Sequence, residues 1–94
     1  MAKYQLNVQF SAKFKKDFKS IIKRGYDIKL FEEVVMPLRT EEPLPEKHCD
    51  HTLKGEFLGH RECHISPDWL LIYKIETNAL IFSLTRTGTH SDLF

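Results

Sequence analysis

The sequence of 94 residues has no long hydrophobic run, only two cysteines and almost no net charge. Its apolar runs are all shorter than the roughly 18 residues that a membrane-spanning helix needs, so we expect no membrane contact. Two cysteines, Cys49 and Cys63, are too few for a disulfide scaffold, and they form no Cys-x-x-Cys pair. The apolar segment of a signal peptide is also missing after Met1. We therefore expect a cytoplasmic protein with free thiols.

The net charge of +1 hides an uneven distribution. Residues 1–29 carry eight basic and two acidic side chains, whereas residues 30–50 carry two basic and six acidic ones. A lysine-rich segment is either solvated or in contact with the phosphates of a nucleic acid, and we take Lys13 and Lys16 as candidate RNA-backbone contacts. The acidic stretch that follows argues against a surface that binds polyanions on all sides.

Length and composition, 41% hydrophobic and 29% charged, predict one domain over residues 1–94. Alternating apolar and polar residues over 3–10 predict a half-buried strand. A helix is expected from its N-cap Ser11 to Gly25, and a second helix from its N-cap Asp27. Two helices joined by so short a turn should form an antiparallel pair. Their predicted apolar faces are Phe14, Phe18, Ile21 and Ile22 in the first and Ile28, Phe31, Val34, Val35 and Leu38 in the second.

The second half of the chain predicts a long loop followed by three strands. Residues 39–54 have no periodicity and contain Pro43 and Pro45, which indicates an extended loop, and long loops in small domains tend to be functional. The expected strands are residues 56–65, 69–75 and 79–86, with turns at 66–68 and 76–78 and a bulge or close backbone approach at Gly59. Period two places Leu58, His60, Glu62 and His64 on one face of the first of these strands and Arg61, Cys63 and Ile65 on the other.

The element order β-α-α-β-β-β predicts an α+β fold with two layers. A helical hairpin should pack on one face of a mainly antiparallel sheet of about four strands. Because a hairpin brings its far ends together, the last two strands should place His64 and Asp68 near Arg86 and His90. Two imidazoles, a carboxylate and a guanidinium at one end of a sheet can move protons and hold a phosphate.

This set of residues suits metal-free cleavage of RNA, in which the 2′-OH is the nucleophile. His90 is the leading candidate for proton transfer, as the general acid, because the pKa of histidine lies near the operating pH. His64 is a proton-transfer partner or a phosphate contact, Asp68 a base or an orienter of an imidazole, and Arg86 the phosphate clamp. His51 is expected to arrive from the long loop. The structural alternative is that Arg86 only pairs with Asp68 at the surface and that the histidines are solvated side chains.

A zinc site is a second interpretation, because His48, His51, His60 and His64 share a seventeen-residue window with both cysteines. Its ligands would come from His48, Cys49, His51, Cys63 and His64. Adjacent residues on a strand point to opposite faces, however, so Cys63 and His64 cannot both reach one ion, and His90 and Arg86 would have no role. We therefore expect no bound metal.

Two aromatic residues stand beside these candidates. Trp69 begins the most apolar strand, so it belongs in the core, with stacking on an RNA base as the alternative. Phe94 is the last residue of the sequence and can either pack back onto the sheet or stack on a base beside His90.

Three segments of the sequence resemble the YafQ-type branch of the RelE/ParE toxin superfamily. They are Asp50-His51-x-Leu53-x-Gly55, Gly59-x-Arg61-x-x-His64-Ile65-x-Pro67-Asp68-Trp69-Leu70-Leu71-Ile72-Tyr73-Lys74 and Arg86-Thr87-Gly88-Thr89-His90-Ser91-x-Leu93-Phe94. The resemblance covers essentially the whole chain in the element order of the family. It implies a RelE-like fold and a bacterial toxin of a type II toxin–antitoxin system.

The resemblance also implies an activity. Such a toxin is an mRNA interferase, an endoribonuclease that enters the ribosomal A site, cuts mRNA there without a metal or other cofactor and so inhibits translation. Cleavage would leave a 2′,3′-cyclic or 3′-phosphate and a 5′-hydroxyl. The matching motif positions place His51, His64, Asp68, Arg86, His90 and Phe94 in the active site, with Trp69 beside it.

The implied partner is a small dimeric antitoxin, often ribbon-helix-helix in its DNA-binding half, whose extended part wraps the toxin. Operator DNA would be bound only by the toxin–antitoxin complex. The alternative is a ParE-like toxin that shares the scaffold but acts by binding a target such as gyrase. A pure binding protein has no need of two histidines, an aspartate and an arginine gathered at one sheet end, which favours the nuclease.

Overall fold

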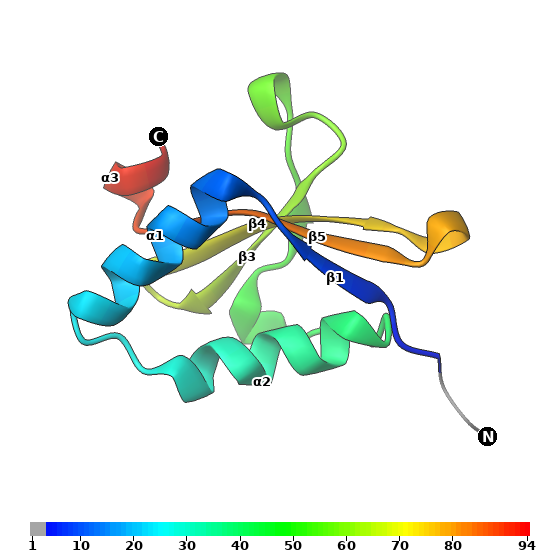
Figure 1. Cartoon of the computed structure of the whole chain (residues 1–94), viewed down its shortest axis with the longest axis horizontal. Helices are drawn as coiled ribbons and strands as arrows, with labels where there is room; N and C mark the ends of the chain where they lie inside the picture. The colour runs from blue at the N-terminus through cyan, green and yellow to red at the C-terminus, as the bar shows by residue number, and fades with distance from the viewer. Residues whose placement is uncertain (1–3) are drawn as a thin grey trace.

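A mixed five-stranded sheet in the order β1-β5-β4-β3-β2 forms the centre of the computed structural model, which describes residues 4–94 (Figure 1). The outer strand β1 (Asn7–Phe10) pairs in parallel with β5 (Ile81–Gly88), and the other neighbours pair antiparallel. These other strands are β2 (His51–Thr52), β3 (Arg61–Ser66) and β4 (Trp69–Glu76). The α+β class is confirmed, with five strands instead of about four because the predicted loop contributes the short β2.

Both predicted helices form and begin at their predicted caps. In α1 (Ala12–Lys23) the Ser11 hydroxyl accepts the Phe14 N–H at 2.9 Å, and in α2 (Ile28–Arg39) the Asp27 carboxylate accepts the Lys29 N–H at 2.9 Å. Figure 1 shows the two helices running in opposite senses, with α2 across one face of the sheet and α1 along β5. No helix within residues 4–94 is long and apolar enough to cross a membrane.

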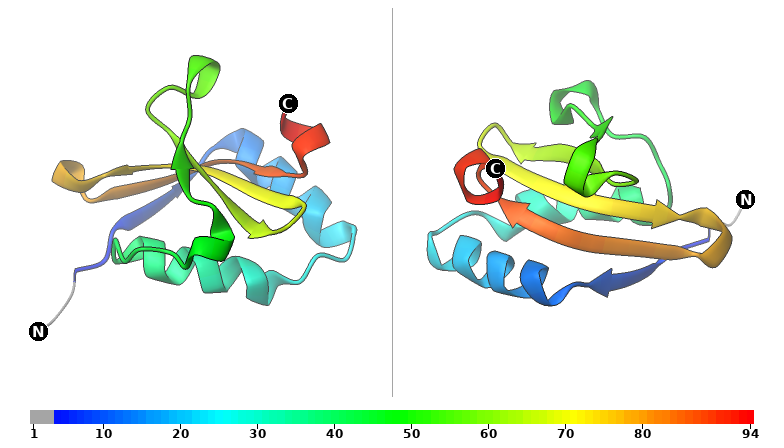
Figure 2. Two further views of the ribbon diagram at one scale, coloured as in Figure 1. Left: turned by 180° about the vertical axis from the view of Figure 1, so that it is seen from behind. Right: turned by 90° about the horizontal axis from the view of Figure 1, so that it is seen from above.

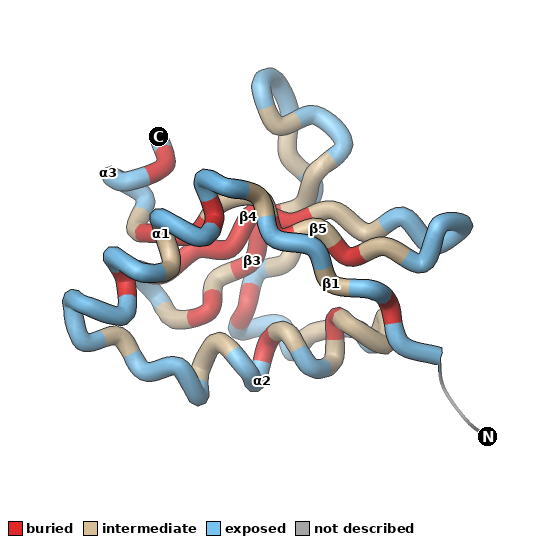
Figure 3. The backbone as a smooth tube through the Cα atoms, viewed as in Figure 1, coloured by how far each residue is buried: buried red, intermediate tan, exposed pale blue. Residues whose placement is uncertain are grey.

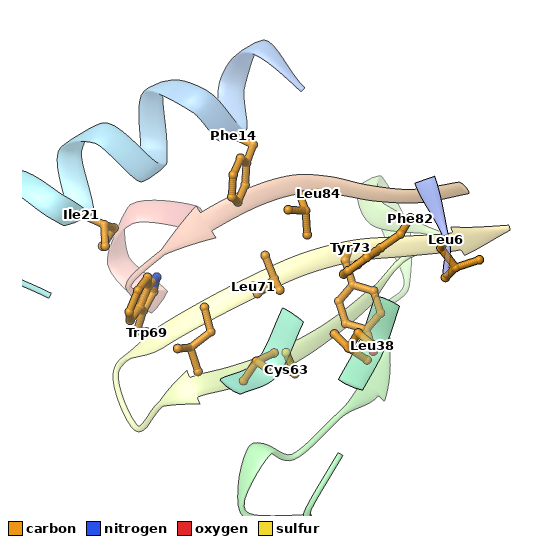
Figure 4. Close-up of a cluster of buried hydrophobic side chains, with 12 residues drawn as sticks. Leu6, Phe14, Ile21, Leu38, Cys63, Trp69, Leu71, Tyr73, Phe82 and Leu84 are labelled. Carbon is orange, nitrogen blue, oxygen red and sulfur yellow. The ribbon is translucent and has the colours of Figure 1, made fainter. Parts of the chain in front are cut away.

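The main core lies between the sheet and these helices. Figure 3 shows that the buried residues are concentrated there, and Figure 4 shows their side chains. Its buried members are Leu6, Phe14, Ile21, Val34, Leu38, Cys63, Ile65, Trp69, Leu71, Tyr73, Phe82 and Leu84. Two residues of the predicted helix faces are exposed instead, Ile22 at 39% and Ile28 at 47%. Neighbouring residues of a helix point about 100° apart, so Ile22 turns away where Ile21 faces the core, and Ile28 lies at the very start of α2.

The central strand β4 alternates between the two faces of the sheet. Trp69, Leu71 and Tyr73 enter the main core, whereas Leu70 and Ile72 point to the opposite face. There they form a smaller apolar cluster with Leu93, Leu53 and Phe57. Because β4 is buried on both faces, it reads as a continuous apolar run in the sequence.

The segment before β3 departs from the prediction of a strand over 56–65. Only Arg61–Ser66 are in β3, while residues 53–60 project from the sheet and contain the short 3-10 turn Gly55–Phe57 (Figures 1 and 2). Gly59 has φ +89°, a left-handed conformation outside the range of a regular strand, and a Cβ there would meet no atom within 4 Å. The expected close approach at Gly59 is therefore wrong, and the pairing of β3 with β4 is irregular between His64 and Ser66 instead.

The end of the chain folds into an element that periodicity does not predict. Strand β5 extends to Gly88, two residues further than expected, and α3 (His90–Leu93) follows at once. A capping box holds α3, because the Thr89 hydroxyl accepts the Asp92 N–H and the Asp92 carboxylate accepts the Thr89 N–H. A Cβ on Gly88 would lie 2.9 Å from that of Asp92, so the absence of a side chain lets α3 fold back.

Candidate active site

The pairing register brings the strand residues of the predicted site onto one face of the sheet. His64 pairs with Leu70, and Leu70 with Gly88; one row further, Glu62 pairs with Ile72, and Ile72 with Arg86. Paired residues project to the same face, and this face is the one of the smaller apolar cluster, opposite to the main core. Strands β3 and β5 lie two strand spacings apart, about 10 Å.

The short helix α3 stands on this same face and carries His90. Its residue Leu93 packs onto Leu70 and Ile72, and Figure 2 shows α3 and the projecting segment 53–60 on the side of the sheet away from α2. The ring of His90 lies 5.1 Å from that of Phe94. Phe94 is 58% exposed, and its ring lies 6.2 Å from that of Phe57. His90 and Phe94 therefore lie on the same face of the sheet as His64 and Arg86.

Asp68 lies in the exposed turn between β3 and β4, and its carboxylate is held from the helix side. Tyr26 O–H donates to it at 2.9 Å and Ser66 O–H at 3.3 Å. The hydrogen bond with Asp68 raises the pKa of Tyr26. In residues 4–94 no hydrogen bond joins Asp68 to His64 or His90, so Asp68 does not orient an imidazole in this structure.

Arg24 connects this turn with α3. Its guanidinium donates to the Asp92 carboxylate at 2.7 Å and lies over the Tyr26 ring at 5.6 Å from the centroid. The hydrogen bond from Arg24, together with the backbone N–H of Thr89, lowers the pKa of Asp92 to about 2. The helix that carries His90 and the tyrosine that holds Asp68 are thus joined by one side chain.

The Arg86 guanidinium is bound by Asp17, an acidic residue of α1. Its Nε donates to Asp17 Oδ2 at 2.6 Å and its Nη2 to Asp17 Oδ1 at 3.2 Å. The hydrogen bonds with Asp17 raise the pKa of Arg86, which keeps its charge. The alternative that Arg86 only pairs with Asp68 is wrong, because its carboxylate partner is Asp17.

His51 lies at the other end of the row, on β2. Its Nε2 is 3.5 Å from Oε1 of Glu62, its pairing partner on β3, and its Nδ1 is 2.7 Å from the Cys49 carbonyl oxygen. The Glu62 side chain is 8% exposed, and its Oε2 has no hydrogen-bond partner in the described part of the chain. Sequence reasoning gave Glu62 no role, although the period of two had already placed it on the face of His64.

The predicted substrate contacts Trp69, Lys13 and Lys16 differ in the exposure of their side chains. Trp69 is 0% exposed, and its Nε1 donates to Thr87 Oγ1 at 2.8 Å. The ring therefore cannot stack on a base in this structure, which corrects its assignment as a substrate contact and leaves it a core residue. Lys13 and Lys16 are exposed on α1 beside β5, where a backbone phosphate can reach them.

The five residues considered for zinc do not form one set of ligands, although His48, Cys49 and His64 line the same cavity. Cys63 is fully buried in the main core, where desolvation raises the pKa of its thiol, while Cys49 is exposed. His48 is buried, with its Nδ1 2.6 Å from the His64 carbonyl oxygen. Within residues 4–94 no three His, Cys, Asp or Glu side chains are grouped so that they can hold a metal ion.

The chain is similar to known proteins in both sequence and fold. The family described as "Bacterial toxin of type II toxin-antitoxin system, YafQ" matches residues 6–94. The mRNA interferase toxin YafQ of Escherichia coli K12 is 40% identical over 91 residues, which cover 96% of this chain and 97% of that protein. A crystal structure of a metal-bound toxin from Helicobacter pylori has a TM-score of 0.88 at 47% identity, covering 95% of this chain and 99% of that one. A YafQ chain in the E. coli DinJ-YafQ toxin–antitoxin complex has a TM-score of 0.86 at 36% identity, covering 97% and 99%.

Proposed function

Since the chain belongs to the YafQ family of bacterial toxins of type II toxin–antitoxin systems, we propose that it is an mRNA interferase. It cleaves mRNA in the ribosomal A site and so inhibits translation. The reaction is acid/base catalysis that uses the 2′-OH of the RNA and no metal. A cognate antitoxin neutralises it.

One observation carries this proposal: His64, Arg86 and His90 share one face of the sheet. The strands fix the first two through the rows His64–Leu70–Gly88 and Glu62–Ile72–Arg86. The third is fixed by α3, which Leu93 anchors to the same face. A phosphodiester bound on this face meets proton-transferring groups and a fixed positive charge together.

The reaction has two proton transfers and one exchange of bonds at phosphorus. A base takes the proton of the 2′-OH, the O2′–P bond forms, and the P–O5′ bond breaks as an acid protonates O5′. His90, exposed at the start of α3, is the acid. His64 or Asp68 takes the 2′-OH proton, and Arg86 stabilises the charge that develops on the phosphate oxygens. The products are a 2′,3′-cyclic phosphate and a 5′-hydroxyl.

His51 and the aromatic tail complete the substrate surface. His51 beside Glu62 places a second imidazole at the β2 end of the row. Phe94, more than half exposed and adjacent to the His90 ring, stacks on a base next to the cleaved bond. The exposed Lys13 and Lys16 contact the RNA backbone from α1.

The proposed partner is an antitoxin dimer with a ribbon-helix-helix DNA-binding half and an extended segment that wraps the toxin. A YafQ chain has been solved in a toxin–antitoxin complex with DinJ, which supports such a partner here. Operator DNA is bound by the complex and not by the toxin alone.

The decisive experiment compares the wild type with His90→Ala. Loss of the general acid should lower the rate of mRNA cleavage on programmed ribosomes by about 10²–10⁴-fold. The free energy of unfolding should stay that of the wild type. New 5′-hydroxyl ends should appear in translated messages only with the wild type. A 2′-deoxynucleotide on the 5′ side of the cleaved bond should abolish cleavage, because it removes the nucleophile.

Asn78→Ala is the matched control, because Asn78 is exposed in the turn Thr77–Ala79, which joins β4 to β5 at the opposite end of these strands from Asp68 and Gly88. It should cleave like the wild type. Growth arrest by the wild type and His90→Ala alike, without new RNA ends, would overturn the nuclease and favour a ParE-like toxin that acts by binding. Cleavage of the 2′-deoxy message would overturn the mechanism but not the activity.

A further inference from the structure

The outer edge of β5 is hydrogen-bonded to β1 in its first half, and to Ser11 and Asp17 in its second half. β1 pairs with β5 only from Ile81 to Leu84, because the chain leaves the sheet after Phe10 and enters α1. Buried or half-buried backbone groups need hydrogen-bond partners, and α1 supplies them beyond that point. The Ser11 N–H donates to the Leu84 carbonyl at 3.1 Å and its hydroxyl donates to the Thr85 carbonyl at 2.7 Å. The Thr87 N–H donates to Asp17 Oδ2 at 3.2 Å.

The same part of β5 contains a bulge that reverses the direction of its side chains. Tyr73 pairs with Leu84 but Ile72 pairs with Arg86, which leaves Thr85 as the extra residue. In a regular strand Leu84 and Arg86 would share a face. With the bulge, Leu84 stays in the main core and Arg86 moves to the row of Ile72 on the opposite face. Ser11 and Asp17 hold the backbone on either side of this bulge.

Asp17 also determines which edge of Arg86 remains available. A guanidinium has five N–H donors arranged on two forks that each match a carboxylate or a phosphate. Asp17 occupies the fork formed by Nε and Nη2, with N···O distances of 2.6 and 3.2 Å, and within residues 4–94 no hydrogen bond engages Nη1. The two side chains are 22% and 17% exposed, which protects the pair from solvent. The free fork is therefore held in one direction.

Asp17 stands out on its own helix. Residues 12–23 contain five lysines and no other acidic residue. Ion pairs between Asp17 and the exposed lysines would add little to the stability of the helix. The carboxylate instead accepts three hydrogen bonds from β5, two from the Arg86 side chain and one from the Thr87 N–H.

We propose that Asp17 is a positioning residue, which fixes the Arg86 guanidinium and the Thr85 bulge so that the free fork of Arg86 meets the scissile phosphate. The role rests on the proposed nuclease function. Asp17 itself touches no substrate and acts through Arg86.

The test measures kcat and KM for cleavage of mRNA on programmed ribosomes with four variants: Asp17→Ala, Asp17→Asn, Asp17→Glu and Arg86→Ala. Loss of the carboxylate should lower kcat by roughly 10- to 100-fold, because a misplaced charge loses its alignment with the transition state. KM should change by less than about twofold, because other surfaces bind the ribosome. Asp17→Glu keeps the charge and should restore part of kcat.

The double variant Asp17→Ala/Arg86→Ala separates positioning from a merely structural role. If Asp17 acts through Arg86, its removal should have less than about a twofold effect once Arg86 is absent. A structural role would lower kcat by the same factor in both backgrounds. The NMR signal of the Arg86 Nε–H gives a readout that needs no activity: its protection from exchange with water should be lost in Asp17→Asn. This isosteric variant also decides the matter if Asp17→Ala does not fold.

Glu32→Ala is the control, because Glu32 is an exposed acid on α2. It should match the wild type in kcat and in the Arg86 signal. Two results would overturn the positioning role and leave the proposed function intact. One is an active wild type whose kcat equals that of Asp17→Asn. The other is a double variant whose loss of kcat is the product of the losses in the two single variants. A wild type that cleaves no RNA would overturn the proposed function, and the positioning role with it.

Discussion

The two faces of the sheet differ in what they bury. On the helix side, twelve apolar residues, none more than 4% exposed, pack between the strands and both long helices. On the other side, the buried cluster formed by residues 4–94 consists of Leu70, Ile72 and Leu93, and charged groups such as Glu62 and Arg86 border it. The hydrophobic free energy of folding therefore comes mainly from one face. The other face can carry polar groups because little of the stability depends on it.

The largest effect is expected from a cavity on the helix side. Phe82 is 0% exposed and its ring lies 5.7 Å from that of Tyr73, edge to face. Phe82→Ala removes most of a buried ring and should lower the free energy of unfolding by about 3–5 kcal/mol, measured by urea denaturation. The cleavage rate per folded molecule should stay near that of the wild type. A loss below about 1 kcal/mol would contradict the assignment of stability to this face.

A truncation on the opposite face should reverse the balance between stability and activity. Leu93 is 9% exposed and anchors a four-residue helix, so Leu93→Ala should lower the free energy of unfolding by only about 2 kcal/mol, the low end for such a change. The loss of cleavage should be larger than in Phe82→Ala at equal folded fraction, because α3 carries His90. Equal activity of the two variants would show that α3 is held by other contacts.

The helix-side face could be predicted from the sequence because its signals are local. The caps at Ser11 and Asp27, the turn at Pro67 and the apolar run of β4 each act within a few residues, and each is found where expected. On the other face, α3 is too short for a helical period and was not predicted, although Thr89 and Asp92 have the spacing of a capping box.

The contacts that shape the site are long-range, which is why they escaped prediction. Arg86 and Asp17 are 69 residues apart in the sequence, and Tyr26 and Asp68 are 42 apart. No periodicity or spacing relates such pairs. Hairpin geometry predicted that Arg86 and Asp68 lie at one end of the sheet, but the identity of each partner depends on how α1 and the α1–α2 turn pack against it.

The smallest effect is expected from the ion pair that joins α3 to the helix side. The pKa of Asp92 is about 2 in the folded protein and 3.8 is its ordinary value, so the folded state binds its proton less readily than the unfolded state. The contribution of Asp92 to stability is therefore present above pH 4 and is lost as the pH falls towards 2. Asp92→Asn should melt slightly below the wild type at pH 6, by less than Leu93→Ala does, and the two melting temperatures should converge towards pH 2. Because Arg24 and Asp92 are both exposed, high salt should reduce the difference at pH 6. A difference that stays constant with pH would mean that the charge of Asp92 is not its cause. Equal melting temperatures at pH 6 would mean that the hydrogen bond from the Thr89 N–H, which an asparagine amide oxygen can also accept, holds α3 without the charge.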